Sequence, residues 1–264
     1  MKFIDLQTIA DQIPDGATLA LGGMTLYRRP VAFVRGLLAR ETPPRDLTLL
    51  NFTAGYESDL LVGAGCVAKV RSVYFGLETF GLAPMFTAMA GRGEINVVDE
   101  TEASIVMGLR AAMGGVGYMP SRAWIGTDLP KLRPDVKQIT DPYTDEPLMA
   151  FPAIPVDYAV LHGLAADRAG NVILNNNLGI DLELVYVADT VIVTVEEIVD
   201  HVGKSAAHTL LPAPGADVII HAPRGAWPTS CHPLYPFGGG ELLRYIDACT
   251  AGEFDAYVQT LIGT

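Results

Sequence analysis

A chain of 264 residues suffices for one large α/β domain or two small ones, and its 50% apolar content allows a sizeable core. Its formal net charge of -12 repels nucleic-acid phosphates and anionic lipid headgroups, so neither is an expected partner. No uncharged apolar run reaches membrane-spanning length, and Asp5 and Asp11 interrupt the N-terminal stretch, so neither a membrane span nor a signal peptide is expected.

The first half of the chain alternates short apolar runs with helical patterns. Pro14 ends the first expected helix, and Gly22-Gly23 ends the first buried strand. The expected strands span residues 17–21, 47–52, 70–75 and 95–98. The expected helices span residues 5–13, 59–64, 82–90 and 102–113, and a further helix begins at Pro30. Apolar strands that alternate with helices predict a parallel sheet covered on both faces.

The second half continues this alternation after residues 130–155, a stretch rich in proline and charge that we interpret as a long excursion. Its expected strands span residues 158–161, 172–174, 190–195 and 218–221, and its expected closing helices span residues 241–248 and 254–262. The predicted fold class is therefore α/β: an open, mostly parallel sheet with helices on both faces, in a single domain over residues 1–264. Ligands of such sheets bind beyond the carboxyl ends of the strands.

Two glycines and two arginines follow the first of these strands. Glycine lets a backbone approach a ligand closely, and its amide can bind an anion. Arg28 and Arg29 lie just after Gly22 and Gly23 and directly before Pro30, where a helix N-terminus adds further positive potential. These features predict an anion-binding site, with Arg28 as the better candidate; the alternative is a structural turn whose arginines face solvent.

The segment Asp99-Glu100-Thr101-Glu102 places three carboxylates between a strand end and a helix start. Acidic residues at this position commonly cap a helix and interact with its dipole. The functional alternative is that one carboxylate faces the cleft as a general base. Asp99 or Thr101 suits the cap better, so Glu102 is the candidate catalytic residue.

Cysteine and histidine show none of the spacings that metal sites require. Scattered cysteines are typical of reduced thiols in a cytosolic protein, so we expect a cytoplasmic location and no metal. The cysteines are Cys66, Cys231 and Cys249.

Taken in order, several motifs resemble the A (alpha) subunit of class I CoA-transferases, on the glutaconate CoA-transferase side of the family. Each motif is weak alone, and their order and spacing over almost the full chain carry the resemblance. The matching segments are Gly22-Gly23 with Arg28-Arg29-Pro30, residues 108–112, 118–122 and 126–128, Asp167 with Gly170-Asn171, residues 195–199, and residues 225–228 with Cys231 and Tyr235.

The resemblance implies an open α/β sheet, a B (beta) subunit as partner, and acyl-CoA and carboxylic acid substrates. Coenzyme A is then a substrate, and no resident cofactor is expected. The family's nucleophile is a glutamate in a Ser-Glu-Asn-Gly type motif on the other subunit. Because this sequence contains no Glu-Asn-Gly, we expect the partner to carry the nucleophile and this chain to supply part of the acyl pocket.

This chain departs from the family pattern at two places, and the first of them supports an alternative function. Glu102 resembles, by position, a glutamine of the family's ketoacid branch, and that glutamine donates a hydrogen bond to the oxyanion. The same glutamate resembles the base of ring-opening, steroid-degrading hydrolases of this family, so a CoA-dependent hydrolase is the alternative function. Acidic residues are also expected after Tyr235, where this chain has Pro236-Phe237-Gly238-Gly239-Gly240.

A non-enzymatic ligand-sensing domain is a third hypothesis. The acidic net charge and the lack of a DNA-binding segment disfavour it.

Overall fold

A ten-stranded sheet forms the centre of the molecule in the computed structural model, which describes residues 2–263. Eight strands form a continuous path in which every neighbouring pair is parallel. In spatial order these are β1 (Lys2–Phe3), β13 (Val218–His221), β11 (Ala188–Val199), β9 (Val156–Asp167), β2 (Thr18–Leu21), β3 (Leu47–Ala54), β4 (Val67–Phe75) and β5 (Asn96–Asp99). Off this path, β10 (Val172–Leu174) pairs antiparallel with β9 and with β12 (Thr209–Leu211). The mostly parallel sheet is confirmed.

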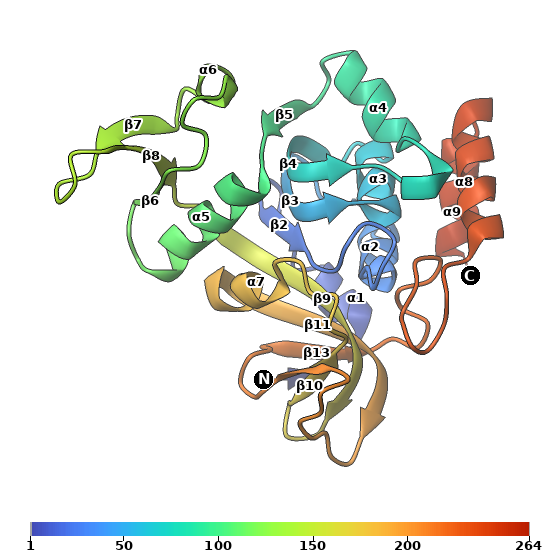
Figure 1. Ribbon diagram of the computed structural model, residues 1–264. Helices are drawn as coiled ribbons and strands as arrows, with labels where there is room; N and C mark the ends of the chain where they lie inside the picture. The colour runs from blue at the N-terminus through green and yellow to red at the C-terminus, as the bar shows by residue number, and fades with distance from the viewer. Residues whose placement is uncertain (1, 264) are drawn as a thin grey trace.

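Helices cover both faces of this sheet (Figure 1), as the sequence predicts. One face buries its core residues against six helices: α1 (Leu6–Ala10), α2 (Val31–Leu38), α3 (Tyr56–Gly63), α4 (Pro84–Gly91), α8 (Gly239–Ala251) and α9 (Phe254–Ile262). The other face packs on α5 (Glu102–Met113) and α7 (Asp181–Val187), through side chains such as Leu109 and Leu184. Removing these apolar side chains from water is the main stabilising contribution to such a layered fold.

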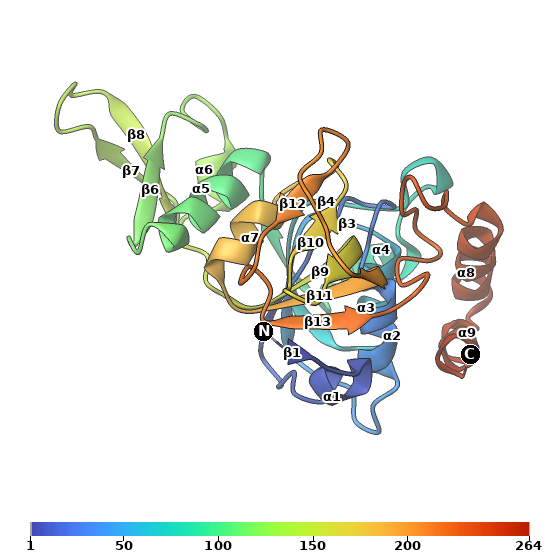
Figure 2. The same cartoon turned by 90° about the horizontal axis from the view of Figure 1, so that it is seen from below.

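A second, three-stranded sheet projects from the main body beside α5 (Figures 1 and 2). It consists of β6 (Tyr118–Ser121), β8 (Pro147–Pro152) and β7 (Lys137–Thr140), with the short helix α6 (Leu129–Leu132) between β6 and β7. Its own small core is made by Trp124, Val136, Met149 and Phe151. The stretch interpreted as an excursion therefore has regular structure, although the expectation of a single domain stays untested.

Local sequence explains where the elements near the carboxyl ends of the strands begin. The side chain of Thr101 accepts a hydrogen bond from Ser104 N (3.2 Å), and Ser104 Oγ accepts one from Thr101 N (2.8 Å), which together make a capping box for α5. The prediction that Thr101 suits the cap is confirmed, and α5 begins at Glu102 as expected. Pro30, predicted as the first helical residue, is the N-cap of α2, so the helix begins one residue later, at Val31.

Among the residues described, no helix combines the length and the hydrophobicity needed to cross a membrane.

A one-turn 3-10 helix, η1 (Glu78–Phe80), follows β4 at the carboxyl edge of the sheet.

Candidate functional site

The residues selected from the sequence all lie at the carboxyl edge of the parallel sheet, but not in one cluster. Gly22 to Arg29 follow β2, and Glu102 follows β5. Strands β3 and β4 lie between β2 and β5, which separates the two groups by about 14 Å if neighbouring strands are about 4.8 Å apart. The edge thus has two centres, one at Arg28 and Arg29 and one at the start of α5.

Arg28 is fully buried, and its guanidinium is paired within the chain. It forms an ion pair with Asp181, the first residue of α7, which is also fully buried. Its other hydrogen bonds go to Asn175 Oδ1 (3.0 Å) and to the carbonyl oxygens of His162 (2.6 Å) and Asn177 (3.0 Å). These contacts link the turn after β2 to β9 and to the segment before α7.

Arg29 is likewise buried and paired with Glu57 of α3, whose Oε1 accepts from Arg29 Nη2 at 2.6 Å and from Nε at 2.9 Å. Arg29 also donates to Asn51 Oδ1 (2.6 Å) and to Gly23 O (2.9 Å). Two buried guanidinium groups require two buried counter-charges, because an unpaired charge in the interior is strongly unfavourable.

The glycines next to these arginines face the same internal carboxylate. Gly23 N donates to Asp181 Oδ1 at 2.8 Å, and Gly23 has a φ of +78°, which favours glycine. A Cβ on Gly22 would lie 2.2 Å from a methyl group of Leu161 and 2.5 Å from Asp181 Oδ1. The anion that contacts Gly23 and Arg28 in the structure is therefore a carboxylate of the protein itself.

As substrate-binding residues, Gly22, Gly23, Arg28 and Arg29 remain predictions without a test. The structure gives all four another role, which is to fix the turn after β2 against α3 and α7. The alternative of solvent-facing arginines is wrong, because both side chains are fully buried. Sequence analysis missed the partners Asp181 and Glu57; the need for two acids to balance two arginines was the available signal.

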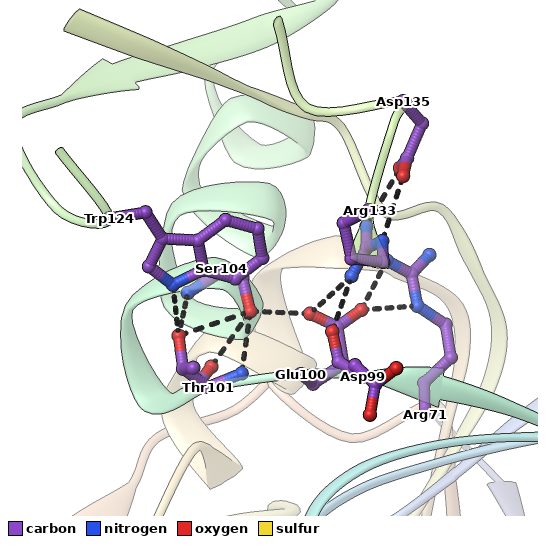
Figure 3. A network of polar contacts seen from close by, with 8 residues as sticks. All are labelled: Arg71, Asp99, Glu100, Thr101, Ser104, Trp124, Arg133 and Asp135. Carbon is purple, nitrogen blue, oxygen red and sulfur yellow. Dashed lines mark hydrogen bonds and ion pairs between the residues drawn. The ribbon is translucent and has the colours of Figure 1, made fainter. Parts of the chain in front are cut away.

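The start of α5 is built around the buried carboxylate of Glu100 (Figure 3). Glu100 Oε1 accepts from Arg71 Nε of β4 at 2.8 Å, and its Oε2 accepts from Ser104 Oγ (2.5 Å) and lies 3.0 Å from Arg133 Nη1. Trp124 Nε1 donates to Thr101 Oγ1 at 2.9 Å. This network joins β4, the end of β5, the first turn of α5 and the segment between β6 and β7.

Arg133 is the residue that connects this network to the small sheet. It donates to Asp99 O (3.0 Å) and to both carboxylate oxygens of Asp135 (2.8 and 2.7 Å), and its guanidinium lies 5.9 Å from the centre of the Trp124 ring. Burial opposes its charge, but the hydrogen bonds to Asp135 and the charge of Glu100 raise the pKa of Arg133. It therefore stays a cation that Glu100 and Asp135 share.

Glu102 has an exposed side chain in the first turn of α5. Within residues 2–263, its carboxylate makes no hydrogen bond or ion pair, whereas the carboxylate of Glu100 is buried and committed to two arginines. Asp99 is exposed as well, but it belongs to β5 and lies before the helix. The structure thus places Glu102 where a ligand or partner can reach it. Its predicted catalytic role remains untested.

Another buried carboxylate, Glu196 of β11, contacts the loop after β13. Its oxygens accept from His162 Nε2 (2.8 Å), from Arg224 N (2.6 Å) and from the hydroxyl of Tyr235. Burial opposes its ionisation, but the hydrogen bonds from His162 and Tyr235 keep the pKa of Glu196 below its usual range. Sequence analysis used Glu196 and Tyr235 only as family matches.

The neighbours of Glu196 are neutral at physiological pH. Burial lowers the pKa of His162 and raises the pKa of Cys231 to about 12. His162, Cys231 and Glu196 each offer one ligand atom within 4.8 Å of the others, which is a possible set of metal ligands. His162 and Glu196 are already hydrogen-bonded to each other, so the arrangement serves as a network that fixes the loop. The prediction that the protein binds no metal and no resident cofactor remains untested.

A pocket of about 910 Å³ opens beside this loop. Its walls come from Tyr27 after β2, residues 175–177, Ala207, Ser230 and residues 232–237. Tyr27 and the loop after β13 follow the carboxyl ends of parallel strands, where ligands of open α/β sheets bind. The pocket is therefore the main candidate binding site at this edge, within the part of the chain that the structure describes.

Comparison with protein families finds that the family described as "Coenzyme A transferase" matches residues 6–222. The A subunit of a 3-oxoadipate CoA-transferase from Pseudomonas knackmussii is 34% identical over 226 residues, which cover 84% of this chain and 79% of that protein. A cholesterol ring-cleaving hydrolase IpdA subunit of Mycobacterium tuberculosis is 30% identical over 244 residues, which cover 85% of this chain and 80% of that protein.

Two solved structures have a similar fold and a related sequence. The decarboxylase AibA/AibB, solved as a variant, superposes with a TM-score of 0.91 at 30% identity and covers 100% of this chain and 98% of its own. The glutaconate coenzyme A-transferase of Acidaminococcus fermentans superposes with a TM-score of 0.88 at 27% identity. The superposition covers 99% of this chain and 89% of that chain. These similarities confirm the resemblance that the sequence motifs indicate.

Proposed function

Because this chain belongs to the coenzyme A transferase family, we propose that it is the A (alpha) subunit of a heteromeric enzyme that moves CoA between an acyl-CoA and a carboxylic acid. The observation that carries this proposal is the similarity to a CoA-transferase of the same subunit type over 84% of the chain. The same similarity supports a B (beta) subunit as partner. The sequence has no Glu-Asn-Gly segment, so the partner would carry the nucleophilic glutamate.

In this mechanism, the partner's carboxylate attacks the thioester carbonyl and displaces CoA as a thiolate, which leaves an acyl anhydride. The thiolate then attacks the anhydride at the glutamyl carbonyl, which releases the carboxylic acid and forms a glutamyl-CoA thioester. The acceptor acid regenerates acyl-CoA by the reverse steps. This chain would contribute one wall of the active site, with Glu102 and the start of α5 turned toward the partner.

A hydrolase is the second candidate, supported by the exposed carboxylate of Glu102 and by the similarity to a ring-cleaving hydrolase. In that reaction Glu102 would remove a proton from water as a general base. The similarity to a decarboxylase adds loss of CO₂ as a product to be measured. Transfer also releases the donor's acid, so the reactions are distinguished by the need for an acceptor as well as by their products. Transfer makes a second acyl-CoA only when an acceptor acid is present, hydrolysis releases a free acid or opens a ring without one, and decarboxylation releases CO₂.

The test uses this chain co-expressed with the protein encoded beside it, supplied with a panel of acyl-CoAs with and without acetate as acceptor. We expect a new acyl-CoA only when acceptor is present, and no turnover by this chain alone. Borohydride added during turnover should reduce a glutamyl-CoA thioester, so mass spectrometry should find one modified glutamate in the partner and none in this chain. Acceptor-independent release of free acid would contradict the proposal.

Glu102→Gln provides the residue-level prediction. The substitution keeps the shape and replaces the charge with an amide, which can donate to an oxyanion. In a transferase we expect the complex to keep its transfer rate, or to gain. In a hydrolase that uses Glu102 as base, the rate would fall on the order of a hundredfold to ten-thousandfold. Glu94→Gln, at another exposed glutamate, is the matched control.

A further inference from the structure

The pocket beside the loop after β13 is uncharged on its inner surface. Among its described lining residues there is no lysine, arginine, aspartate or glutamate, and His232 is the one histidine. Apolar side chains form the rim: Leu234 is 50% exposed and Phe237 is 38% exposed. Exposed apolar side chains that gather around a concave site are typical of sites that bind an apolar ligand.

Arg28 lies directly behind the pocket wall, yet offers it no positive charge. Arg28 Nε donates to Asn175 Oδ1, and Asn175 lines the pocket, but the guanidinium is fully buried and neutralised by Asp181. Two charges lie beside the lining residues: Tyr27 donates its hydroxyl to Glu78 Oε2 at 3.2 Å, and the Arg224 guanidinium lies 5.2 Å from the centre of the Tyr235 ring. Arg224 is not itself a lining residue, so a second carboxylate inside the pocket would lose water without a cation in the lining to pair with.

The amide side chains of the wall are largely engaged in holding the chain. Asn175 Nδ2 donates to His232 O (3.2 Å), while Asn176 Nδ2 donates to Ala206 O (3.1 Å) and its Oδ1 accepts from Thr209 Oγ1 (3.0 Å). These two amides connect the loops around the pocket, and the Asn177 side chain has no hydrogen-bond partner among the described residues. The polar lining therefore mainly shapes the pocket, and the donor that it leaves free is a neutral amide.

The pocket is also preformed. Tyr235 is fixed by its hydrogen bond to Glu196 and accepts one from Ala226 N at 3.2 Å, and its backbone pairs with Cys231. Phe237 packs edge-on against Phe80, with ring centres 5.6 Å apart. A site that is already shaped binds without the entropy loss of ordering its walls.

We infer that this pocket binds an uncharged, apolar acyl group and discriminates against acyl groups that carry a second carboxylate. The inference rests on the proposed function, because it takes the substrate to be an acyl thioester or its free acid. It differs from the prediction drawn from the sequence, in which Arg28 is the better candidate for binding an anionic group. The buried Arg28–Asp181 pair is the reason for the difference.

The test compares hexanoate with adipate and hexanoyl-CoA with adipyl-CoA, which are pairs of equal carbon number that differ by one carboxylate. Binding of the two acids to the co-expressed complex is measured by isothermal titration calorimetry. We expect hexanoate to bind at least about tenfold more tightly, because an unpaired carboxylate in the pocket loses its hydration. Equal binding, or tighter binding of adipate, would overturn the inference.

Two variants test the assignment to this pocket. Leu234→Arg places a cation at the rim and should improve adipate binding about three- to tenfold, whereas Tyr143→Arg, at a 94% exposed side chain between β7 and β8, should change neither acid. Phe237→Ala should weaken hexanoate binding roughly three- to tenfold through lost apolar contact. If Phe237→Ala instead weakens only assembly with the partner, the pocket is part of the interface between the two proteins and the inference is wrong.

The titration separates this inference from the proposed function. A complex that prefers hexanoate but transfers no CoA would refute transfer and retain the pocket assignment. A complex that transfers CoA most efficiently from adipyl-CoA would support transfer and refute the pocket assignment.

Discussion

Asp181→Ala is expected to lower the free energy of unfolding by about 3–5 kcal/mol, because it leaves the guanidinium of Arg28 buried without its counter-charge. The loss also frees Gly23 N, which donates to the same carboxylate. Urea denaturation of the purified chain measures the effect as a lower midpoint with an unchanged slope.

The control for this prediction is an ion pair of the same kind on the surface. Glu94 pairs with Arg92, and both side chains are about half exposed, at 46% and 57%. Glu94→Ala should therefore leave the denaturation midpoint almost unchanged, because solvent screens an exposed pair. A double variant, Asp181→Leu with Arg28→Met, removes both charges and should recover much of the lost stability. Equal losses for Asp181→Ala and Glu94→Ala would contradict a buried pair.

The main sheet could be predicted because its strands and helices are specified locally. Helix α5 shows this best: Thr101 and Ser104 make a capping box within four residues, and the predicted bounds 102–113 are those observed. Strand β13 is a short, mostly apolar run in the sheet, and the predicted bounds 218–221 are those observed. Where a segment's own residues determine its conformation, the sequence is sufficient.

The small sheet could not be predicted for the opposite reason. Its segment is interrupted by Pro130, Pro134 and Pro142, which are typical of loops. Its strands are stabilised by a small core to which separate segments of the chain each contribute one or two buried residues, too few to show a period. Helix α7 was missed as well, because it is only seven residues long and is fixed by the contact between Asp181 and Arg28. These elements depend on tertiary contacts.

The same distinction divides the candidate site. The exposure of Glu102 follows from its place at the start of a capped helix, so local sequence was enough to select it. The partners of Arg28 are not local, since Asp181 lies 153 residues further along the chain. A sequence motif of glycine and arginine indicates that an anion is bound, and only the fold decides whether that anion is a ligand or a side chain.

The network at the start of α5 gives the second large expected effect. Glu100→Ala should lower the free energy of unfolding by about 3–5 kcal/mol, because Arg133 is almost fully buried and Arg71 largely buried, and both pair with this carboxylate. Glu102→Ala, two residues away, should leave the denaturation midpoint nearly unchanged, because its exposed side chain makes no polar contact with the described residues. Urea denaturation of the two variants side by side measures the difference.

A second measurement shows whether Glu100 also holds the start of α5 in place. Hydrogen exchange should accelerate in Glu100→Ala at the first turn of α5 and around Trp124, which the network joins, while α9 on the far side of the sheet should be unaffected. In the complex, Glu100→Ala should then lower turnover even though Glu100 is buried, because the start of α5, which would form one wall of the active site, loses its fixed position. If Glu100→Ala and Glu102→Ala destabilise the chain equally, the buried network is not what holds this end of the sheet together.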